Sequence, residues 1–341
     1  MKKNKKLDIE IKPNEITNET KASMKVRIIS AIVGVLIIIP PIFLGDWFFF
    51  AFVLFLSVVT SYEVVHCGKG KASFWVYFTT ILLGVLCVSW PVFLGLINGD
   101  INSTSGHAYD YYQNMNISLV IVFVGASLLF TNVVLHENFD VRDACYVFTI
   151  IILVSLGCQG MMYTRFVTSA ESSAHNHDWF NTYDNFVSCK FILYPILGTF
   201  STDIGAYFVG IFFGKKKLNE RISPKKTYGG FIGGIFVSGI ITATYAFIMA
   251  ANGHAILPGV FDIAHWYNIV VMSLFMPILA TLGDFVFSAI KRYYGIKDFG
   301  NLIPGHGGLL DRVDSLTFVF AGLALYTLLF SGLSNGGQLL V

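Results

Sequence analysis

Residues 26–44 read VRIISAIVGVLIIIPPIFL, a stretch whose only charged residue is Arg27. An α-helix needs about 20 consecutive apolar residues to cross the hydrocarbon core of a bilayer. Eight further apolar runs follow along the chain: 47–60, 74–97, 117–135, 145–164, 186–213, 230–250, 267–290 and 316–333. The pattern predicts an all-α, polytopic transmembrane protein of about nine membrane-spanning helices. The second run is short, so we expect a tight helical hairpin with the first run or a re-entrant element.

The composition excludes an ordinary soluble protein. Hydrophobic residues make up 55% of the 341 residues and charged residues 13%, whereas soluble globular chains carry about 25% charged residues. The five cysteines lack C-x-x-C spacing, so we predict neither a disulfide framework nor a zinc site. Residues 1–25 are polar and lysine-rich, which is typical of a flexible basic tail and not of a cleaved signal peptide. We expect no nucleic-acid partner.

The basic residues indicate how the chain is oriented. If the N-terminus is cytosolic, the segments on the cytosolic side hold all 23 Lys and Arg residues except Arg165 and Lys190. Loops 98–116 and 252–266, which then lie outside, contain neither residue type. Cytosolic loops of membrane proteins are enriched in Lys and Arg. We therefore predict an integral protein of the cell membrane with its N-terminus in the cytosol and its C-terminus outside.

The polar residues within the apolar runs divide the chain into regions. They fall almost entirely after residue 200, which predicts a basic cytosolic tail (1–25), an N-terminal transmembrane scaffold (26–190) and a C-terminal transmembrane catalytic region (191–341). Glu63 and His66, after the second run, are interpreted as interfacial residues. A transporter built from inverted repeats would show interrupted helices in both halves, so that class is disfavoured.

The densest polar stretch runs from residue 283 to residue 315. Within it, Asp284, Ser288, Lys291 and Arg292 are spaced at i, i+4, i+7 and i+8, which places them on one face of a helix. Asp284 lies about 9 Å inside the predicted span at 1.5 Å per residue. A carboxylate at that depth requires a wet or protein-lined cavity and a partner. The stretch therefore predicts a site near the cytosolic surface.

A glycine-rich loop follows that helix. Residues 305–308 read GHGG, and Asp311 and Asp314 come next at a spacing of i, i+3 near the start of the last run. Glycine lets backbone amides approach an anion closely. Carboxylates among cations can hold a divalent cation, which together with the cations can bind phosphates. The alternative is that the carboxylates only complement the helix dipole, and that the cations only follow the positive-inside rule.

A second cluster precedes this stretch. Asp203 lies about 15 Å inside the sixth run, deep enough to be a functional candidate. Residues 214–230 read GKKKLNERISPKKTYGG, a basic loop that leads into a helix but lacks the P-loop pattern. Such a loop suits a triphosphate. It could instead be a solvated cytosolic loop that is attracted to anionic lipids.

These residues resemble the phosphatidate cytidylyltransferase (CDP-diacylglycerol synthase) family. Residues 288–315 satisfy every fixed position of the family pattern S-x-x-K-R-x-x-x-x-K-D-x-G-x-x-x-P-G-H-G-G-x-x-D-R-x-D-S. The upstream patterns D-x-x-A-Y-x-x-G, F-G-K-x-K-L and I-S-P-K-K-T are matched by residues 203–210, 213–218 and 222–227. The resemblance thus covers about residues 200–315. One position departs from it, because Gly229 stands where the family usually carries a glutamate.

The resemblance implies an activity. A phosphate oxygen of phosphatidate would attack the α-phosphorus of CTP, and pyrophosphate would leave. The implied cofactor is Mg²⁺, alone or with a second cation, and the implied partners are CTP, phosphatidate, membrane lipids and a second copy of the chain. The alternatives are another CTP-dependent lipid transferase, a prenyl-lipid kinase and, less favoured, a transporter. We also expect that Gly229→Glu would restore an orienting acid and raise kcat.

The resemblance also implies roles for individual residues. The implied metal ligands are Asp284 and Asp311. The implied catalytic residues are Asp284, Lys291, Arg292, Asp311 and Asp314. The implied substrate-binding residues are Asp203, Ser223, Lys225, Lys226, Thr227, Ser288, Lys297, Asp298, His306, Gly307, Gly308 and Arg312.

Overall fold

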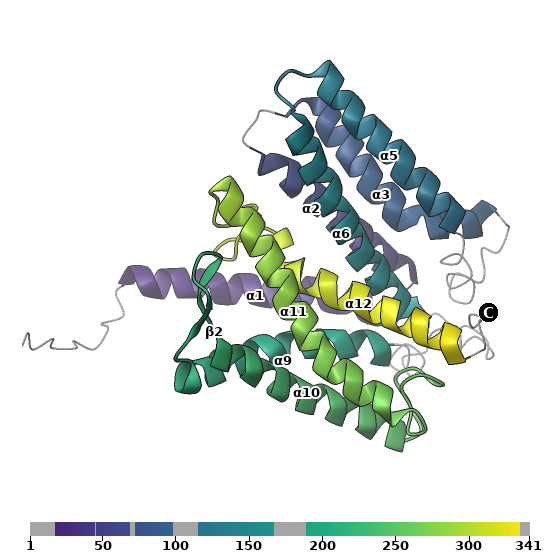
Figure 1. The fold of residues 1–341 in the computed structure, drawn as a ribbon, viewed down its shortest axis with the longest axis vertical. Helices are drawn as coiled ribbons and strands as arrows, with labels where there is room; N and C mark the ends of the chain where they lie inside the picture. Colours follow the sequence, from purple (N-terminus) through teal and green to yellow (C-terminus); the bar gives the residue numbers. More distant parts are fainter. Residues whose placement is uncertain (1–17, 45, 69–71, 98–114, 167–188, 335–341) are drawn as a thin grey trace, which may run out of the picture.

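The computed structural model describes residues 18–44, 46–68, 72–97, 115–166 and 189–334 (Figure 1). Most of the predicted basic tail and of the predicted external loop 98–116 lies outside these residues. The helices in this part of the chain are α1 (Asn18–Leu44), α2 (Asp46–His66), α3 (Phe74–Ile97), α5 (Met115–Leu135), α6 (Val141–Phe166), α9 (Lys190–Phe213), α10 (Tyr228–Ala251), α11 (Trp266–Tyr294) and α12 (Leu310–Ser334). The strands are β1 (Lys217–Asn219) and β2 (Ser223–Thr227).

The helices confirm the all-α, polytopic membrane fold class. Among the described residues, seven helices are long and apolar enough to cross a membrane, and Phe74–Trp90 and Val120–Leu135 are shorter apolar stretches. The total of nine spans and the orientation remain predictions. The second run differs from our expectation, because α2 continues to His66 and is a full-length span. Residues 57–66 contain the polar residues that made this extension hard to see, but Ser57, Thr60, Ser61 and Glu63 are all buried.

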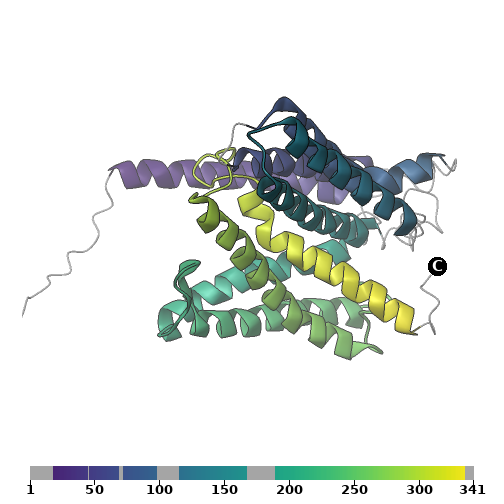
Figure 2. The same ribbon diagram turned by 45° about the horizontal axis from the view of Figure 1, so that its top comes forward.

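The helices form two groups that meet at α12. Helices α2, α3, α5 and α6 pack together on one side, and α9, α10 and α11 pack on the other (Figures 1 and 2). Helix α12 packs against both α6 and α11. One apolar core lies where α2, α3 and α6 meet α12, and a second lies among α9, α10, α11 and α12. The N-terminal and C-terminal regions are therefore joined through α12.

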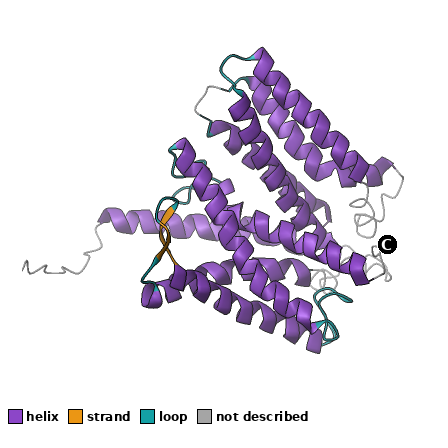
Figure 3. Ribbon diagram, in the orientation of Figure 1, coloured by secondary structure: helices purple, strands orange, loops and turns teal. Residues whose placement is uncertain are grey.

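The basic segment 214–230 differs from the open loop that we expected. Strands β1 and β2 form an antiparallel hairpin in which Lys217 pairs with Thr227 and Asn219 with Ser223 (Figure 3). The Asn219 Oδ1 atom accepts hydrogen bonds from the backbone N–H groups of residues 221 (3.1 Å) and 222 (3.2 Å), which is a favourable way for asparagine to close a turn. The hairpin fixes the lysines of residues 225–226 at the start of α10.

Candidate active site

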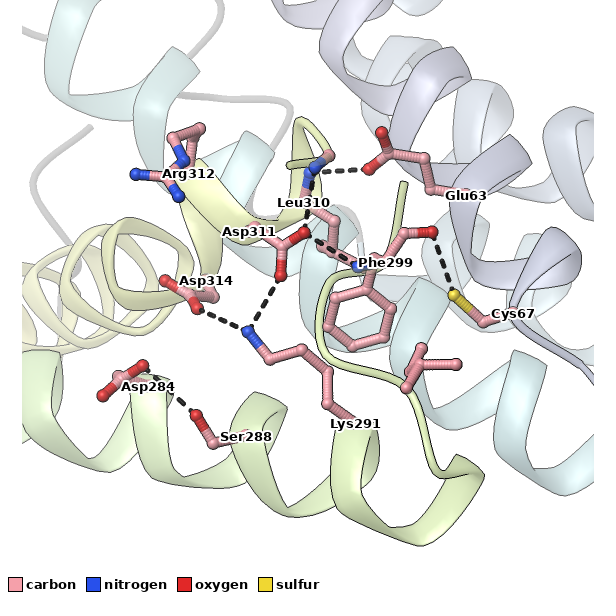
Figure 4. Close-up of polar contacts among 12 residues, drawn as sticks. Glu63, Cys67, Asp284, Ser288, Lys291, Phe299, Leu310, Asp311, Arg312 and Asp314 are labelled. Carbon is pink, nitrogen blue, oxygen red and sulfur yellow. Dashed lines mark hydrogen bonds and ion pairs between the residues drawn. The ribbon is translucent and has the colours of Figure 1, made fainter. Parts of the chain in front are cut away.

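The centre of the site is a buried ion pair between α11 and α12. Lys291, in the last turn of α11, donates from Nζ to Asp311 Oδ1 over 2.8 Å, and its Nζ lies 3.9 Å from Asp314 Oδ2 (Figure 4). The Lys291 side chain is 10% exposed and that of Asp311 is 2% exposed. A buried pair needs good geometry and further hydrogen bonds to offset the loss of hydration. Here both carboxylates take up the charge of one ammonium group.

Asp311 also holds the backbone of the loop between the two helices. Its Oδ2 atom accepts hydrogen bonds from the N–H groups of Phe299 (2.8 Å) and Gly308 (3.0 Å). Gly307 has a φ of +87°, and a Cβ atom there would lie 3.1 Å from Asp311 Oδ2. Glycine at this position therefore serves both the left-handed backbone and the close approach of the carboxylate. The amide of Gly308 is engaged by the protein's own carboxylate and not by open solvent.

Two side chains of the N-terminal region contact the same loop: Glu63 in the last turn of α2 and Cys67 just after this helix. Glu63 is buried, and its carboxylate accepts from the N–H groups of Leu309 (2.8 Å) and Leu310 (2.7 Å). Cys67 donates from Sγ to the carbonyl of Phe299 over 3.1 Å (Figure 4). Burial, and to a lesser degree the Glu63 carboxylate, raises the pKa of the Cys67 thiol to about 12, so this thiol stays protonated as a donor. The interpretation of Glu63 as an interfacial residue did not include these contacts.

A second polar group lies beside the first. Asp284 forms an ion pair with Lys226 of β2 and accepts from Ser288 Oγ over 3.4 Å. Asp284 is within electrostatic range of Asp203 of α9 and of Asp314 of α12. The Lys226 and Asp284 side chains are 31% and 27% exposed, so this pair faces solvent far more than the Lys291–Asp311 pair. Four carboxylates from three helices thus gather around two lysines.

The carboxylates of the site offer oxygen ligands of the kind that a divalent cation requires. Mg²⁺ prefers carboxylate and water oxygens, and the partly exposed Asp284 offers both a carboxylate and access. In Asp311, Oδ2 accepts two backbone N–H groups and Oδ1 accepts Lys291. A carboxylate oxygen has two lone-pair positions, so Oδ1 retains one. The described residues contain no group of three His, Cys, Asp or Glu side chains already placed around a metal position. The residues therefore fit a hydrated cation held mainly through Asp284.

The loop's histidine is attached to α1. The His306 Nδ1 atom lies 2.8 Å from Ser30 Oγ, and the Ser30 hydroxyl also donates to the carbonyl of Arg27 over 3.0 Å. A hydroxyl has one proton, so when Ser30 uses it on Arg27 it accepts from Nδ1–H, and Nε2 of a neutral His306 is then an acceptor. Arg312 donates to the carbonyl of His306 over 2.6 Å. Helices α1 and α12 thus hold this loop from two directions.

The remaining predicted residues are not all part of this cluster. Arg292 turns away from Lys291, because its Nε donates to the carbonyl of Ile222 (3.4 Å) and its Nη1 to that of Ile296 (3.3 Å). Thr227 is buried and caps α10 by accepting from Gly230 N–H over 3.1 Å. Ser223 lies in β2. The side chains of Lys225, Lys297 and Asp298 are exposed at the same end of the molecule.

The position of Gly229 overturns one expectation. A Cβ atom on Gly229 would lie 2.7 Å from the carbonyl oxygen of Phe213 and 3.0 Å from its carbonyl carbon. Real Cβ atoms do not approach backbone atoms that closely, so the backbone of Phe213 and Gly214 at the end of α9 leaves no space for a side chain. The gain in kcat that we expected for Gly229→Glu is therefore unsupported. The position is a packing requirement in this chain.

The chain matches known proteins along most of its length. The model of the cytidylyltransferase family matches residues 25–330. A phosphatidate cytidylyltransferase of Bacillus subtilis (strain 168) is 30% identical over 309 residues, which cover 90% of this chain and 99% of the relative. Phosphatidate cytidylyltransferases of Staphylococcus haemolyticus (29% identical) and Staphylococcus aureus strain COL (30% identical) match over 87% of this chain and 96% of their own lengths.

Proposed function

Because the chain belongs to the cytidylyltransferase family, we propose that it is a phosphatidate cytidylyltransferase, which makes CDP-diacylglycerol and pyrophosphate from CTP and phosphatidate. The observation that carries this proposal is the cluster of Lys226, Lys291 and the surrounding carboxylates at one end of the helical bundle. It supplies the charges of both signs that a transfer between two phosphates needs. The relatives named phosphatidate cytidylyltransferase match over 87–90% of this chain.

The reaction needs no nucleophile from the protein. An oxygen of the phosphatidate phosphate forms a bond to the α-phosphorus of CTP, the bond from that phosphorus to the α–β bridging oxygen breaks, and pyrophosphate leaves with the bonding electrons. Catalysis then consists of positioning the two phosphates and neutralising their charge. Lys226 is the residue best placed to bind the triphosphate, since it is partly exposed and its Asp284 partner is on the neighbouring α11. Lys291 is buried and acts by fixing Asp311 and Asp314.

We further propose that Mg²⁺ assists this reaction. Bound Mg²⁺ supplies charge neutralisation on the phosphates. Asp284 would hold it, and Asp311 could join through the free position on Oδ1. Asp314 and Asp203 lie near enough to contribute charge. Lys226, which pairs with Asp284 in the structure, would be available to a phosphate if that carboxylate held the cation.

The setting of the site suits its two substrates. The long apolar helices place the site at the membrane that holds the acyl chains of phosphatidate, and the partly exposed side chains of Lys226 and Asp284 are accessible to water-borne CTP. The hairpin carries several exposed lysines at this end, and cytosolic loops are rich in such residues. We therefore propose that the site faces the cytosol. A homodimer is also part of the proposal and rests only on the resemblance to the family.

An omission experiment tests the proposed substrates. The purified chain in mixed micelles is given labelled CTP, phosphatidate and Mg²⁺, and each component is left out in turn. The proposal predicts that labelled lipid forms only when all three are present. If a prenyl alcohol or prenyl phosphate replaced phosphatidate at full rate, the acceptor would be wrong and another CTP-dependent lipid transferase would be the better description.

A further inference from the structure

We propose that Glu63, on the N-terminal scaffold, is a positioning residue of the transfer reaction that sets the loop of residues 299–310 and, through it, the Asp311 carboxylate. The inference rests on the proposed function. Asp311 contacts Lys291 on one side of this loop. The Glu63 carboxylate accepts hydrogen bonds from the backbone N–H groups of Leu309 and Leu310 on the other side. The N-terminal region therefore contributes to the site as well as to the membrane anchor.

The first argument is the way the Glu63 carboxylate is used. Its Oε1 atom accepts from Leu309 N–H over 2.8 Å and its Oε2 atom from Leu310 N–H over 2.7 Å. Leu310 begins α12, and the first N–H groups of a helix have no partner within the helix. A carboxylate at this end also complements the helix dipole. The cap for α12 is thus supplied by another helix, 246 residues earlier in the chain.

The second argument comes from the two glycines that face Glu63. A Cβ atom on Gly300 would lie 2.6 Å from Glu63 Oε1, and one on Gly308 would lie 2.7 Å from the same oxygen. Neither glycine has a positive φ, so backbone conformation does not explain them. They leave the space that the carboxylate occupies. Gly308, which belongs to the glycine-rich segment that the sequence connects with anion binding, thus accommodates an anionic group of the protein itself.

The third argument is that Phe299 is held from both sides. Its N–H donates to Asp311 Oδ2 (2.8 Å) and its carbonyl accepts from Cys67 Sγ (3.1 Å). Cys67 follows Glu63 by four residues, so both groups lie on one face at the end of α2. Figure 4 shows Glu63 and Cys67 reaching the loop from the side opposite Lys291. Glu63 holds the N–H of Leu309, next to Gly308, and Cys67 holds the carbonyl of Phe299. The end of α2 therefore contacts the two stretches of backbone whose N–H groups fix Asp311 Oδ2.

The experiment compares Glu63→Gln with the matched variant Thr60→Val. Glutamine keeps the shape of the side chain but has only one acceptor oxygen. The N–H of either Leu309 or Leu310 would therefore face the glutamine NH2 group, which is also a donor. Thr60 is buried one turn earlier on α2, and its hydroxyl bonds only within that helix, so its removal is a control for disturbing α2. Both proteins are assayed for the kcat and the KM values for CTP and phosphatidate. Cys67 labelling by a small maleimide is followed by mass spectrometry.

We expect Glu63→Gln to lower kcat by about 10- to 100-fold, because misplacing a reacting geometry by about 1 Å has effects of that size, with KM values near those of the wild type. We also expect faster labelling of Cys67 in this variant and not in Thr60→Val. A folded Glu63→Gln protein with the kcat of Thr60→Val would overturn the inference, and so would a change confined to KM.

Two further outcomes are separable. If Glu63→Gln cannot be obtained folded, Glu63→Asp replaces it, because this variant keeps the charge and shortens the side chain that holds the N–H groups of Leu309 and Leu310. A lowered kcat with unchanged KM then supports the inference, and a wild-type kcat overturns it. If the wild type forms no CDP-diacylglycerol, the proposed function has failed, and the labelling of Cys67 alone decides whether Glu63 holds the loop.

Discussion

The two ion pairs of the site differ in burial, and the variants Asp311→Asn and Asp284→Asn should reveal this difference. Asp311 and Lys291 are 2% and 10% exposed, whereas Asp284 and Lys226 are 27% and 31% exposed. Removing one partner of a buried pair costs about 3–5 kcal/mol, and here the NH2 group of asparagine would face either Lys291 or the N–H groups of Phe299 and Gly308. A partly exposed pair contributes about 0–1 kcal/mol. The two variants should therefore differ by at least about 2 kcal/mol, or about 30-fold in the unfolding equilibrium constant.

The assay is denaturant unfolding of each variant in detergent micelles, followed by tryptophan fluorescence, with activity measured on the same samples. We expect Asp311→Asn to unfold at a clearly lower denaturant concentration than the wild type. We expect Asp284→Asn to unfold close to the wild type and yet to lose CDP-diacylglycerol formation, because Asp284 is the proposed cation ligand. Equal unfolding midpoints for the two variants would refute the argument from burial. Full activity of Asp284→Asn at limiting Mg²⁺ would refute its role as a ligand.

Three further predictions follow from the contacts of the site. Lys226→Met should lower kcat/KM for CTP by about 100-fold, since it removes a preorganised charge, whereas Lys217→Met on β1 should have little effect in the same steady-state assay. Gly229→Ala should destabilise the protein by about 1–3 kcal/mol through overpacking against the Phe213 carbonyl, whereas Gly34→Ala, which meets nothing within 4 Å, should not change the unfolding midpoint. A cysteine placed in the 214–230 segment should resist an impermeant thiol reagent added to intact cells and react after lysis, and labelling in intact cells would contradict the proposed orientation.

Much of the site could be predicted from local spacing. The i, i+4 spacing of Asp284 and Ser288 brings them within 3.4 Å, and the helix periodicity correctly pointed Lys291 toward the carboxylates that follow the glycine loop. Helical spacing is a local property, so it can be derived from the sequence. The same spacing predicts that Arg292 shares this face. In the structure Arg292 lies one residue further around the helix, and its Nε donates to the carbonyl of Ile222 in the hairpin.

The features that the sequence did not reveal depend on contacts between distant segments. Glu63 follows an apolar run and would be interfacial if its helix ended at residue 60, and its burial depends on a loop 246 residues away. The space at Gly229 is closed by Phe213, a neighbour only through the packing of α9 on α10. The hairpin of residues 217–227 has strands of three and five residues, too short for alternation to indicate them. A carboxylate at the end of an apolar run was the one signal for Glu63 that the sequence offered.

The most direct test of the proposed reaction is the fate of the CTP phosphates. The purified protein is incubated with phosphatidate, Mg²⁺ and CTP that carries a radioactive phosphorus at either the α or the γ position, and the lipid and aqueous products are separated. Cytidylyl transfer predicts that α-label enters the lipid as CDP-diacylglycerol and that γ-label appears only in pyrophosphate. Entry of the γ-label into the lipid, with release of CDP, would show a kinase and would contradict the proposed function.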